Sequence, residues 1–322
     1  MTLALSIQEC PVCHLPITWS NSQTILHRCP NCKSIVSRSN EKNASPIDCL
    51  PVLQKNAALT IGFQGKFAGN PFRITGRVQI SFEHQTINYW TVIDSNSKVA
   101  LLAEGYGFYT WCDLVSLRTS ITVGQLKSGN IFQLFELQNE QLALLEEREK
   151  GNGFFVDGEC WFPFLSGEIT RYFLQVPDGD SFLLLTAEPD KIAGFKQTDI
   201  PADELFQSES VIPFETVKKN CPQCNEVLLF NALPYTKSYC CPHCKNGFYF
   251  ETATEQVRTF KAEGLNWDCA LRPGNKGTID GVDYQVIGAC LKKEENPGSP
   301  TWREYTIFNA RKGFRTLSEF DG

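Results

Sequence analysis

The chain has 322 residues, of which 42% are hydrophobic and 20% charged, and its formal net charge is −6. This length predicts about two domains, and the apolar content, which includes 23 Phe, indicates folded cores rather than a disordered chain. The acidic balance argues against a broad nucleic-acid-binding surface, because phosphate contacts need a basic face.

The first predicted element is a zinc ribbon in residues 1–38, and a second ribbon is predicted in residues 215–252. Each holds two CxxC pairs at ribbon spacing, with Pro after the first Cys of every pair. Two thiolates on one CxxC turn can hold an ion, and the roughly 15 residues between the pairs form a hairpin that brings the second pair to it. The eight predicted metal ligands are Cys10, Cys13, Cys29, Cys32, Cys221, Cys224, Cys241 and Cys244.

The pattern therefore predicts two structural Zn²⁺ ions per chain. Each site of four thiolates carries −2, so the net charge falls to about −10. Basic residues gather near both ribbons and are interpreted as offsetting this charge, with a nucleic-acid patch as the alternative. They are Arg28, Lys33, Arg38, Lys218, Lys219, Lys237 and Lys245.

The remaining cysteines show no paired spacing, which argues against a disulfide framework. They are Cys49, Cys112, Cys160, Cys240, Cys269 and Cys290. No signal peptide is visible before Cys10, and no apolar run approaches the roughly 18 residues of a membrane helix. We therefore expect a cytoplasmic protein, with Cys112 buried beside Trp111.

A β-rich module is predicted in residues 57–207, and a related module in residues 265–322. Two polar segments are interpreted as linkers: 37–53, before the first module, and 207–220, between the first module and the second ribbon. Both modules contain the pattern L-x2-G-x2-G-x3-G-x2-[FY]-x3-G. Corresponding glycines, such as Gly76 and Gly288, lie 212 residues apart. The sequence comparison pairs Trp90 with Trp302 at the same offset. It pairs Glu104 with Glu319 at an offset that is three residues longer. The second module covers only the first third of the repeat, so either the chain is a fragment or this copy is reduced.

The first module is expected to consist of two related halves, 57–118 and 119–207. Ile121–Gly124 resembles Leu59–Gly62, and Gly129–Phe132 resembles Gly69–Phe72. Other local predictions are a bulge at Gly76, a buried strand at 182–185 and a short helix at 201–206. For 136–150 a β-hairpin is preferred to a helix. The resulting fold class is mainly β, with two zinc ribbons alternating with two small antiparallel β-barrel or sandwich-like modules.

The glycine pattern, together with Trp302-Arg303-Glu304-Tyr305 and the run from Gly313 to Gly322, resembles the domain of unknown function 4178 family. Gly158-Glu159-Cys160-Trp161-Phe162-Pro163 is similar to a second-half segment of that family. The resemblance covers most of 57–207 and 265–322 and implies a CxxC ribbon ahead of the domain, as here. It also implies a bacterial source, genes near phage-shock-protein-A-type membrane-stress proteins or polyamine biosynthesis, and no established activity. The family continues with His-Trp where this chain ends, which favours a truncated second copy.

No set of nucleophile, base and orienting group is visible, so the chain is not expected to be an enzyme. His14, His27 and His243 lie beside cysteines that already complete their sites, and His84 stands alone. Asp178, Asp180 and Glu188 are interpreted as solvated positions near a hairpin turn. We predict a non-enzymatic zinc-binding scaffold for protein–protein interactions, without catalytic or small-cofactor residues. The alternatives are nucleic-acid binding through the ribbons, and a small-ligand module linked to polyamines.

Overall fold

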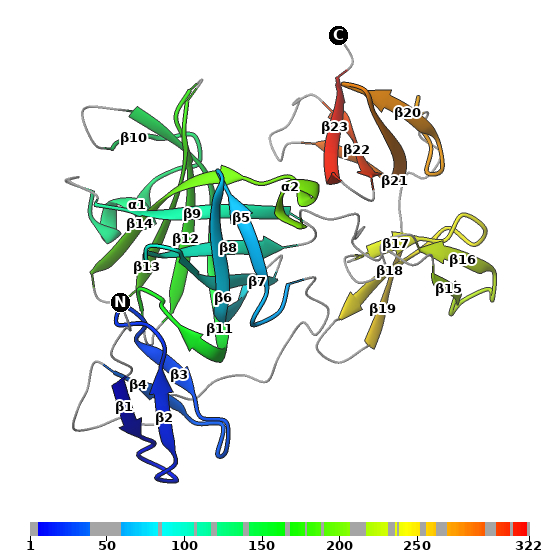
Figure 1. Cartoon of the computed structure of the whole chain (residues 1–322). Helices are drawn as coiled ribbons and strands as arrows, with labels where there is room; N and C mark the ends of the chain where they lie inside the picture. The colour runs from blue at the N-terminus through cyan, green and yellow to red at the C-terminus, as the bar shows by residue number, and fades with distance from the viewer. Residues whose placement is uncertain are drawn as a thin grey trace. The chain divides into compact units, whose positions relative to one another are not determined.

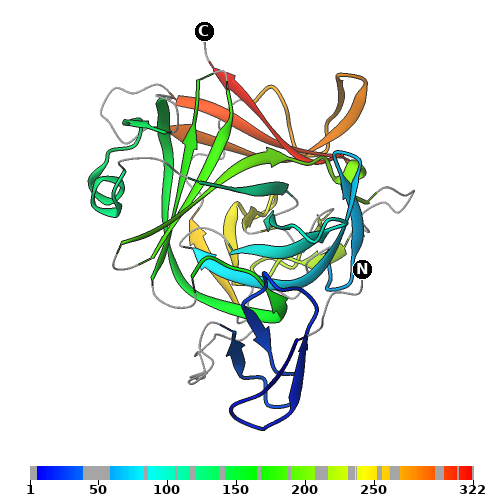
Figure 2. The ribbon, with the colours of Figure 1, turned by 60° about the vertical axis from the view of Figure 1, so that its left-hand side comes forward.

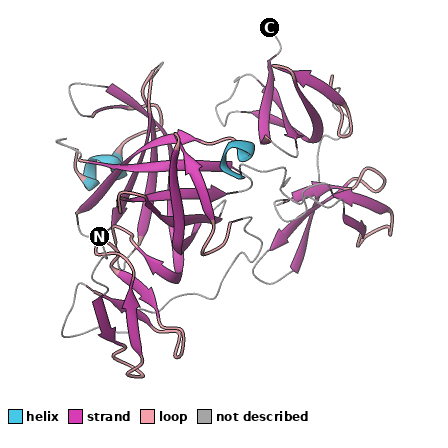
Figure 3. Cartoon of the chain, in the orientation of Figure 1, coloured by secondary structure: helices cyan, strands magenta, loops and turns pink. Residues whose placement is uncertain are grey.

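A computed structural model shows a mainly β chain in which two groups of four cysteines alternate with sheet regions, confirming the predicted fold class (Figures 1 and 3). It forms two compact units, Met1–Gly105 with Tyr109–Ile200, and Tyr106–Phe108 with Pro201–Gly322. The structure describes residues 6–38, 59–82, 86–105, 108–116, 121–137, 142–164, 168–177, 179–187, 190–206, 217–230, 236, 238–251, 256–261, 269–293, 301–309 and 312–320.

The first unit begins with a ribbon of two short hairpins. Strand β1 pairs with β2, and β3 pairs with β4. Their bounds are β1 Ser6–Glu9, β2 Pro16–Trp19, β3 Leu26–Arg28 and β4 Ile35–Ser37.

A closed antiparallel barrel follows the ribbon in the same unit. Its ring runs β6-β7-β8-β9-β14-β13-β12-β11, and pairing of β11 with β6 closes it (Figure 2). Short strands β5 and β10 form hairpins with β6 and β11. The bounds are β5 Gln64–Phe67, β6 Asn70–Phe82, β7 Thr86–Asp94, β8 Val99–Gly105, β9 Phe108–Val115, β10 Leu134–Glu136, β11 Leu142–Cys160, β12 Ile169–Gln175, β13 Ser181–Ala187 and β14 Lys191–Asp199.

Apolar side chains fill the barrel because alternate residues of each strand point inward. Val78, Tyr89, Leu101 and Leu185 belong to one buried cluster, which also contains Cys112. The expected burial of Cys112 is thus confirmed, as is the buried strand at 182–185, which lies in β13. Burial raises the pKa of the Cys112 thiol to about 12, so this cysteine stays protonated and unreactive.

Two helices accompany the strands. Helix α1 (Val123–Ser128) begins with a capping box between Thr122 and Gln125 and packs Leu126 onto the second half of the barrel. Helix α2 (Ala202–Phe206) matches the predicted short helix. The β10–β11 pairing confirms the hairpin that was preferred for 136–150, where a helix was the alternative. No helix in the described ranges has the length and apolar character needed to cross a membrane.

The second unit contains three further sheets. Strand β15 pairs with β16, β18 lies between β17 and β19, and β20 to β23 form a four-stranded meander. The bounds are β15 Val217–Asn220, β16 Val227–Phe230, β17 Ser238–Cys240, β18 Asn246–Glu251, β19 Gln256–Lys261, β20 Lys276–Ile279, β21 Val282–Lys293, β22 Thr301–Asn309 and β23 Gly313–Phe320.

Strand register identifies three copies of one β unit: copy 1 (59–115), copy 2 (130–199) and copy 3 (272–320). Each long strand shifts its register by one residue at the same place, after Ile74, Leu145 and Val286. The carbonyl of that residue accepts a backbone hydrogen bond from Gly62, Phe132 and Gly274, respectively. The predicted bulge at Gly76 is thereby confirmed and recurs in every copy.

This register corrects the proposed echo between the two halves of the first module. Phe132 occupies the position of Gly62, whereas the sequence comparison aligned Phe132 with Phe72 and Gly124 with Gly62. Gly124 instead lies in the first turn of α1. The comparison failed because copy 2 keeps the backbone turn but replaces its glycine with Phe132, which adopts φ of 68°.

The correspondence of Trp90 with Trp302 is also wrong. Trp90 lies opposite Arg77 one residue beyond the bulge, and the residue in that register in copy 3 is Tyr305, opposite Ala289. The segment before β22 (294–300) is longer than the one before β7 (83–85), so the constant offset ends there. Glu104 and Glu319 do correspond, since each lies two positions from that aromatic residue on the neighbouring strand.

Several predictions fall on residues that the structure does not describe. These are the linker over 37–53 beyond Arg38, most of the linker over 207–220, and the side chains of Cys49, His84, Asp178, Glu188 and Lys237.

Candidate metal centres

The eight cysteines predicted from the sequence come together in two groups of four. Within each group the sulfur atoms lie within 4.8 Å of one another. The Cys10–Cys32 and Cys13–Cys29 sulfurs are 3.6 Å apart in the first group, and Cys221–Cys244 and Cys224–Cys241 are 3.7 and 3.6 Å apart in the second. A tetrahedral ion with metal–sulfur bonds of about 2.3 Å needs sulfurs about 3.8 Å apart. Both groups could therefore hold a metal ion.

All four CxxC turns have the same backbone structure. The N–H of the first Cys donates to a carbonyl five residues later, as from Cys10 to Leu15 at 2.9 Å. The residue after the second Cys adopts positive φ, and its N–H donates to the carbonyl of the first Cys. These residues are His14, Lys33, Asn225 and Lys245. The repeated geometry directs both sulfurs of each turn toward the other pair of its group.

Local hydrogen bonds favour the thiolate at some cysteines of each group, whereas burial raises the pKa of Cys10; in the first group, hydrogen bonds from Ser34 also lower the pKa of Cys32. The Leu15 N–H, with the Asn31 side chain, lowers the pKa of Cys13 to about 6, and the backbone and side chain of Asn246 lower the pKa of Cys244 to about 6. Because the thiolate is the form that binds metal, these hydrogen bonds reduce the proton competition at each site.

The nearby histidines lie outside both groups. His14 is exposed beside Glu9, and the His27 ring packs edge-on against Trp19 with its centroid 5.6 Å away. His243 is also exposed. In the second ribbon the sulfur of Cys241, rather than that of Cys240, joins the group, as the CxxC spacing predicted.

The first ribbon is built into the wall of the barrel. Strand β3 extends the sheet by pairing His27 and Leu26 with Glu159 and Cys160 of β11, and the Ile25 N–H donates to the Cys160 carbonyl at 2.9 Å. Leu26 and Ile35 belong to the same buried cluster as the barrel interior. In Figure 1 the ribbon accordingly lies at the end of the barrel where β11 ends. Part of the barrel core is thus supplied by the ribbon.

A buried carboxylate, Glu159, holds the ribbon loop at this junction. It accepts hydrogen bonds from Ser20 N at 2.9 Å and Ser20 Oγ at 2.6 Å, from Asn21 N at 3.1 Å, and from Thr24 Oγ1. Sequence reasoning noted Glu159 only within the family-like Gly-Glu segment and assigned it no role. Its partners are 135 to 139 residues away in sequence, so no local pattern indicated them.

Two glycines let the backbones approach closely beside Glu159. Gly76 and Gly158 face each other across β6 and β11. A Cβ on Gly76 would lie 2.4 Å from the Glu159 carbonyl oxygen, and Gly158 adopts φ of 70° with the Thr75 carbonyl oxygen 2.5 Å from its Cβ position. The glycine that marks the bulge in the sequence therefore also makes room for the ribbon junction.

The second ribbon contains an equivalent cysteine group but no equivalent junction among the described strands. Its sheets β15–β16 and β17–β19 are separate from the β20–β23 meander of the same unit. Its own core consists of the cysteines with Leu228, Phe230 and Phe248. The first cysteine group therefore lies in a ribbon that is joined to the barrel, whereas the second lies in a ribbon whose described strands form separate sheets.

Comparisons of the chain with family models, with curated proteins and with solved structures found no match. The resemblance to the domain of unknown function 4178 family accordingly stays a prediction from the motifs. The chain does, however, contain internal repeats: two cysteine ribbons and three copies of one β unit.

Proposed function

We propose that the chain is a non-enzymatic, zinc-stabilised scaffold that binds a protein partner through the β10–β11 hairpin. Sets of four thiolates at tetrahedral spacing favour Zn²⁺, which has no redox chemistry and is held by four such ligands in structural sites. Because four cysteines fill the coordination of each ion, no position is left for a substrate. The first ion supports the junction between ribbon and barrel, and the second supports ribbon 2.

The observation that carries the proposed partner surface is the position of Phe132. Phe132 is 71% exposed, and its backbone adopts a positive φ that copies 1 and 3 give to glycine. Bulky residues are disfavoured in that region, so Phe132 costs folding free energy without gaining burial. Ile131, Leu134 and Leu142, which lie in the β10–β11 hairpin or just before it, are also more than 40% exposed. Several exposed apolar residues in one segment are typical of a protein-binding surface.

The partner surface is tested by replacing Phe132 with the residue of the other copies. Phe132→Gly should leave the melting temperature unchanged or raise it, because strain is relieved, and should abolish capture of partners from a bacterial lysate. Ile7→Ser, which removes an equally exposed apolar residue from ribbon 1, is the matched control and should leave capture intact. Capture of the same proteins by wild type and Phe132→Gly would contradict the assignment.

The metal assignment is tested by elemental analysis. Zinc-replete protein should contain two zinc ions per chain. Cys241→Ser should lower the zinc content, whereas Cys240→Ser should leave it unchanged, because only Cys241 shares the sulfur cluster. Less than one zinc per chain in the wild type would contradict the proposal.

Nucleic-acid binding is less well supported, because basic residues near the first ribbon already make intramolecular contacts. The Arg28 guanidinium lies 4.8 Å from the Phe155 ring centroid, Arg38 lies 4.5 Å from that of Trp19, and Lys33 donates to the Pro30 carbonyl at 2.6 Å. A salt-dependent mobility shift with DNA or RNA would favour this alternative. Turnover in a hydrolase panel, abolished by one substitution, would oppose the non-enzymatic assignment. The link to membrane-stress proteins remains an expectation from the resemblance.

A further inference from the structure

In two of the three copies a glutamate, buried in copy 1 and partly exposed in copy 3, accepts a hydrogen bond from an aromatic side chain on the neighbouring strand. In copy 1 the Trp90 Nε1–H donates to Glu104 at 2.7 Å, and Asn88 Nδ2 donates to the same carboxylate at 3.3 Å. Glu104 is 2% exposed. In copy 3 the Tyr305 hydroxyl donates to Glu319, whose carboxylate also lies 3.9 Å from the Arg303 guanidinium. In both copies, the same register position of the β unit therefore holds a carboxylate next to an aromatic hydrogen-bond donor.

Copy 2 keeps the aromatic residue but lacks the carboxylate. Tyr172 lies opposite Arg148, in the register of Trp90 and Tyr305. Thr186 lies opposite Thr170, in the register of Glu104 and Glu319. Threonine is shorter than glutamate and carries no charge. The position of the carboxylate is therefore vacated in this copy.

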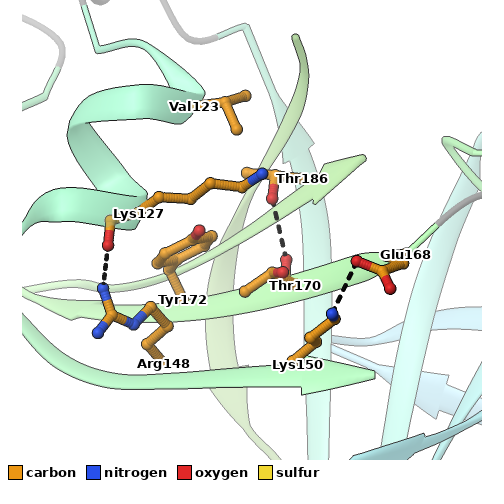
Figure 4. A pocket seen from close by; sticks show the side chains of 8 residues that line it. All are labelled: Val123, Lys127, Arg148, Lys150, Glu168, Thr170, Tyr172 and Thr186. Carbon is orange, nitrogen blue, oxygen red and sulfur yellow. Dashed lines mark hydrogen bonds and ion pairs between the residues drawn. The ribbon is translucent and has the colours of Figure 1, made fainter. Parts of the chain in front are cut away.

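A cavity of about 340 Å³ occupies this place, between α1 and the outer face of the barrel (Figure 4). The buried Tyr172 and Thr186 form its floor, and the Lys127 side chain extends from α1 over the Tyr172 ring toward Thr186. Its lining residues are Val123, Lys127, Arg148, Lys150, Glu168, Thr170, Tyr172 and Thr186.

The cavity has an excess of positive charge. Three lining residues are cationic, Lys127, Arg148 and Lys150, and the one carboxylate among them, Glu168, forms an ion pair with Lys150 at 2.8 Å. Arg148 also donates to the carbonyls of Lys127 and of Gly129, the latter at 3.2 Å, which fixes the end of α1 over the cavity. A polyamine would be repelled here, whereas an anion would be attracted.

The Tyr172 hydroxyl lies on the floor without a hydrogen-bond partner of ordinary geometry among the described residues, although Thr186 is nearby. A buried hydroxyl left without a partner costs folding free energy. Burial also raises the pKa of Tyr172, so the hydroxyl keeps its proton and can donate it to a ligand. In copy 3 the equivalent hydroxyl donates to a carboxylate.

We propose that this cavity is a binding site for a small organic carboxylate, whose carboxylate group takes the place of the missing glutamate of copy 2. The carboxylate would accept the Tyr172 hydroxyl proton in a hydrogen bond and lie beside the Lys127 ammonium group. The rest of the molecule would lie toward Val123 and the Lys150–Glu168 pair. The residues that line the site include none of the eight clustered cysteines and none of the exposed apolar residues near Phe132.

Titration of the full zinc-loaded chain with succinate and with citrate, followed by NMR of the Val123 methyl groups and the Thr170 amide, tests this site. Both probes should produce saturable shifts. Thr186→Glu should restore the carboxylate of copies 1 and 3, raise the melting temperature, and weaken succinate binding at least about tenfold, since the new side chain fills the site. Thr186→Gln, of the same size but uncharged, should give a smaller gain in melting temperature.

A second variant keeps the test decisive if Thr186→Glu does not fold. Lys127→Met removes an exposed cation from α1 and should weaken succinate binding without changing the fold. Absence of saturable shifts with either carboxylate, or unchanged affinity in Lys127→Met, would overturn the proposal. Saturable binding of inorganic phosphate alone, or of spermidine alone, would also overturn it, because the site is assigned to carboxylates.

Discussion

Replacing Cys10 and Cys13 together with Ser is expected to lower the melting temperature of the barrel as well as to unfold ribbon 1. Without its ion the ribbon loses its folding free energy, and Leu26 and Ile35 leave the barrel core. Removal of large apolar groups from a core costs about 2–5 kcal/mol each. For a unit of this size each kcal/mol lowers the melting temperature by about 2–4 °C, so we expect a fall of about 10 °C or more.

The second ribbon offers a matched control. Cys221→Ser with Cys224→Ser removes one ion from an equivalent cysteine group, but its ribbon supplies no strand to the barrel among the described residues. The barrel transition should therefore stay where it is in this variant. A barrel whose melting temperature ignores the loss of Cys10 and Cys13 would show that ribbon 1 is attached without contributing to barrel stability.

Glu159→Ala is expected to destabilise the first unit by about 3–5 kcal/mol while leaving the zinc content unchanged. The buried carboxylate accepts hydrogen bonds from Ser20, Asn21 and Thr24, and hydrogen bonds to a charged group contribute about 1.5–3 kcal/mol each without being additive. Its removal leaves those donors without their acceptor at the junction. Urea unfolding measures the change in the free energy of unfolding.

Two further variants serve as controls for Glu159→Ala: one conservative change at the same position and one change in an exposed ion pair. Glu159→Gln keeps one acceptor oxygen and should cost less than Glu159→Ala. Asp113→Ala removes the partner of an exposed ion pair with Lys98 and should change the free energy of unfolding by no more than about 1 kcal/mol. A loss in Glu159→Ala as small as that in Asp113→Ala would contradict the role of Glu159 as the anchor of the ribbon.

The sequence predicted the features whose determinants are local. The CxxC turns need only four closely spaced residues each, so both cysteine groups were found with the right members, including Cys241 rather than Cys240. The bulge was predicted for the same reason, since the position of Gly76 within an alternating run is visible in a short window. The hairpin at 136–150 was preferred to a helix because of its place in the internal echo, and the hairpin is present although the residue alignment of that echo was wrong.

Features that depend on distant pairing could not be predicted in this way. The junction joins Glu159 to residues 20–24, and the closed ring depends on β11 pairing with β6. Repeat comparison by constant offset failed where connections differ in length, which displaced Tyr305 from its true counterpart, Trp90. The cavity of copy 2 was missed for the same reason, because it becomes apparent only when Thr186 is aligned with Glu104 by strand register.

The central claim, that the metal ion of ribbon 1 stabilises the barrel, is tested most directly by amide hydrogen exchange before and after zinc is removed with a chelator. Exchange reports the local stability of each strand. Loss of zinc should increase exchange in β3, in the end of β11 near Cys160 and in the adjoining part of β6, while the β20–β23 meander keeps its protection. Unchanged protection of β11 and β6 in zinc-free protein would contradict the account.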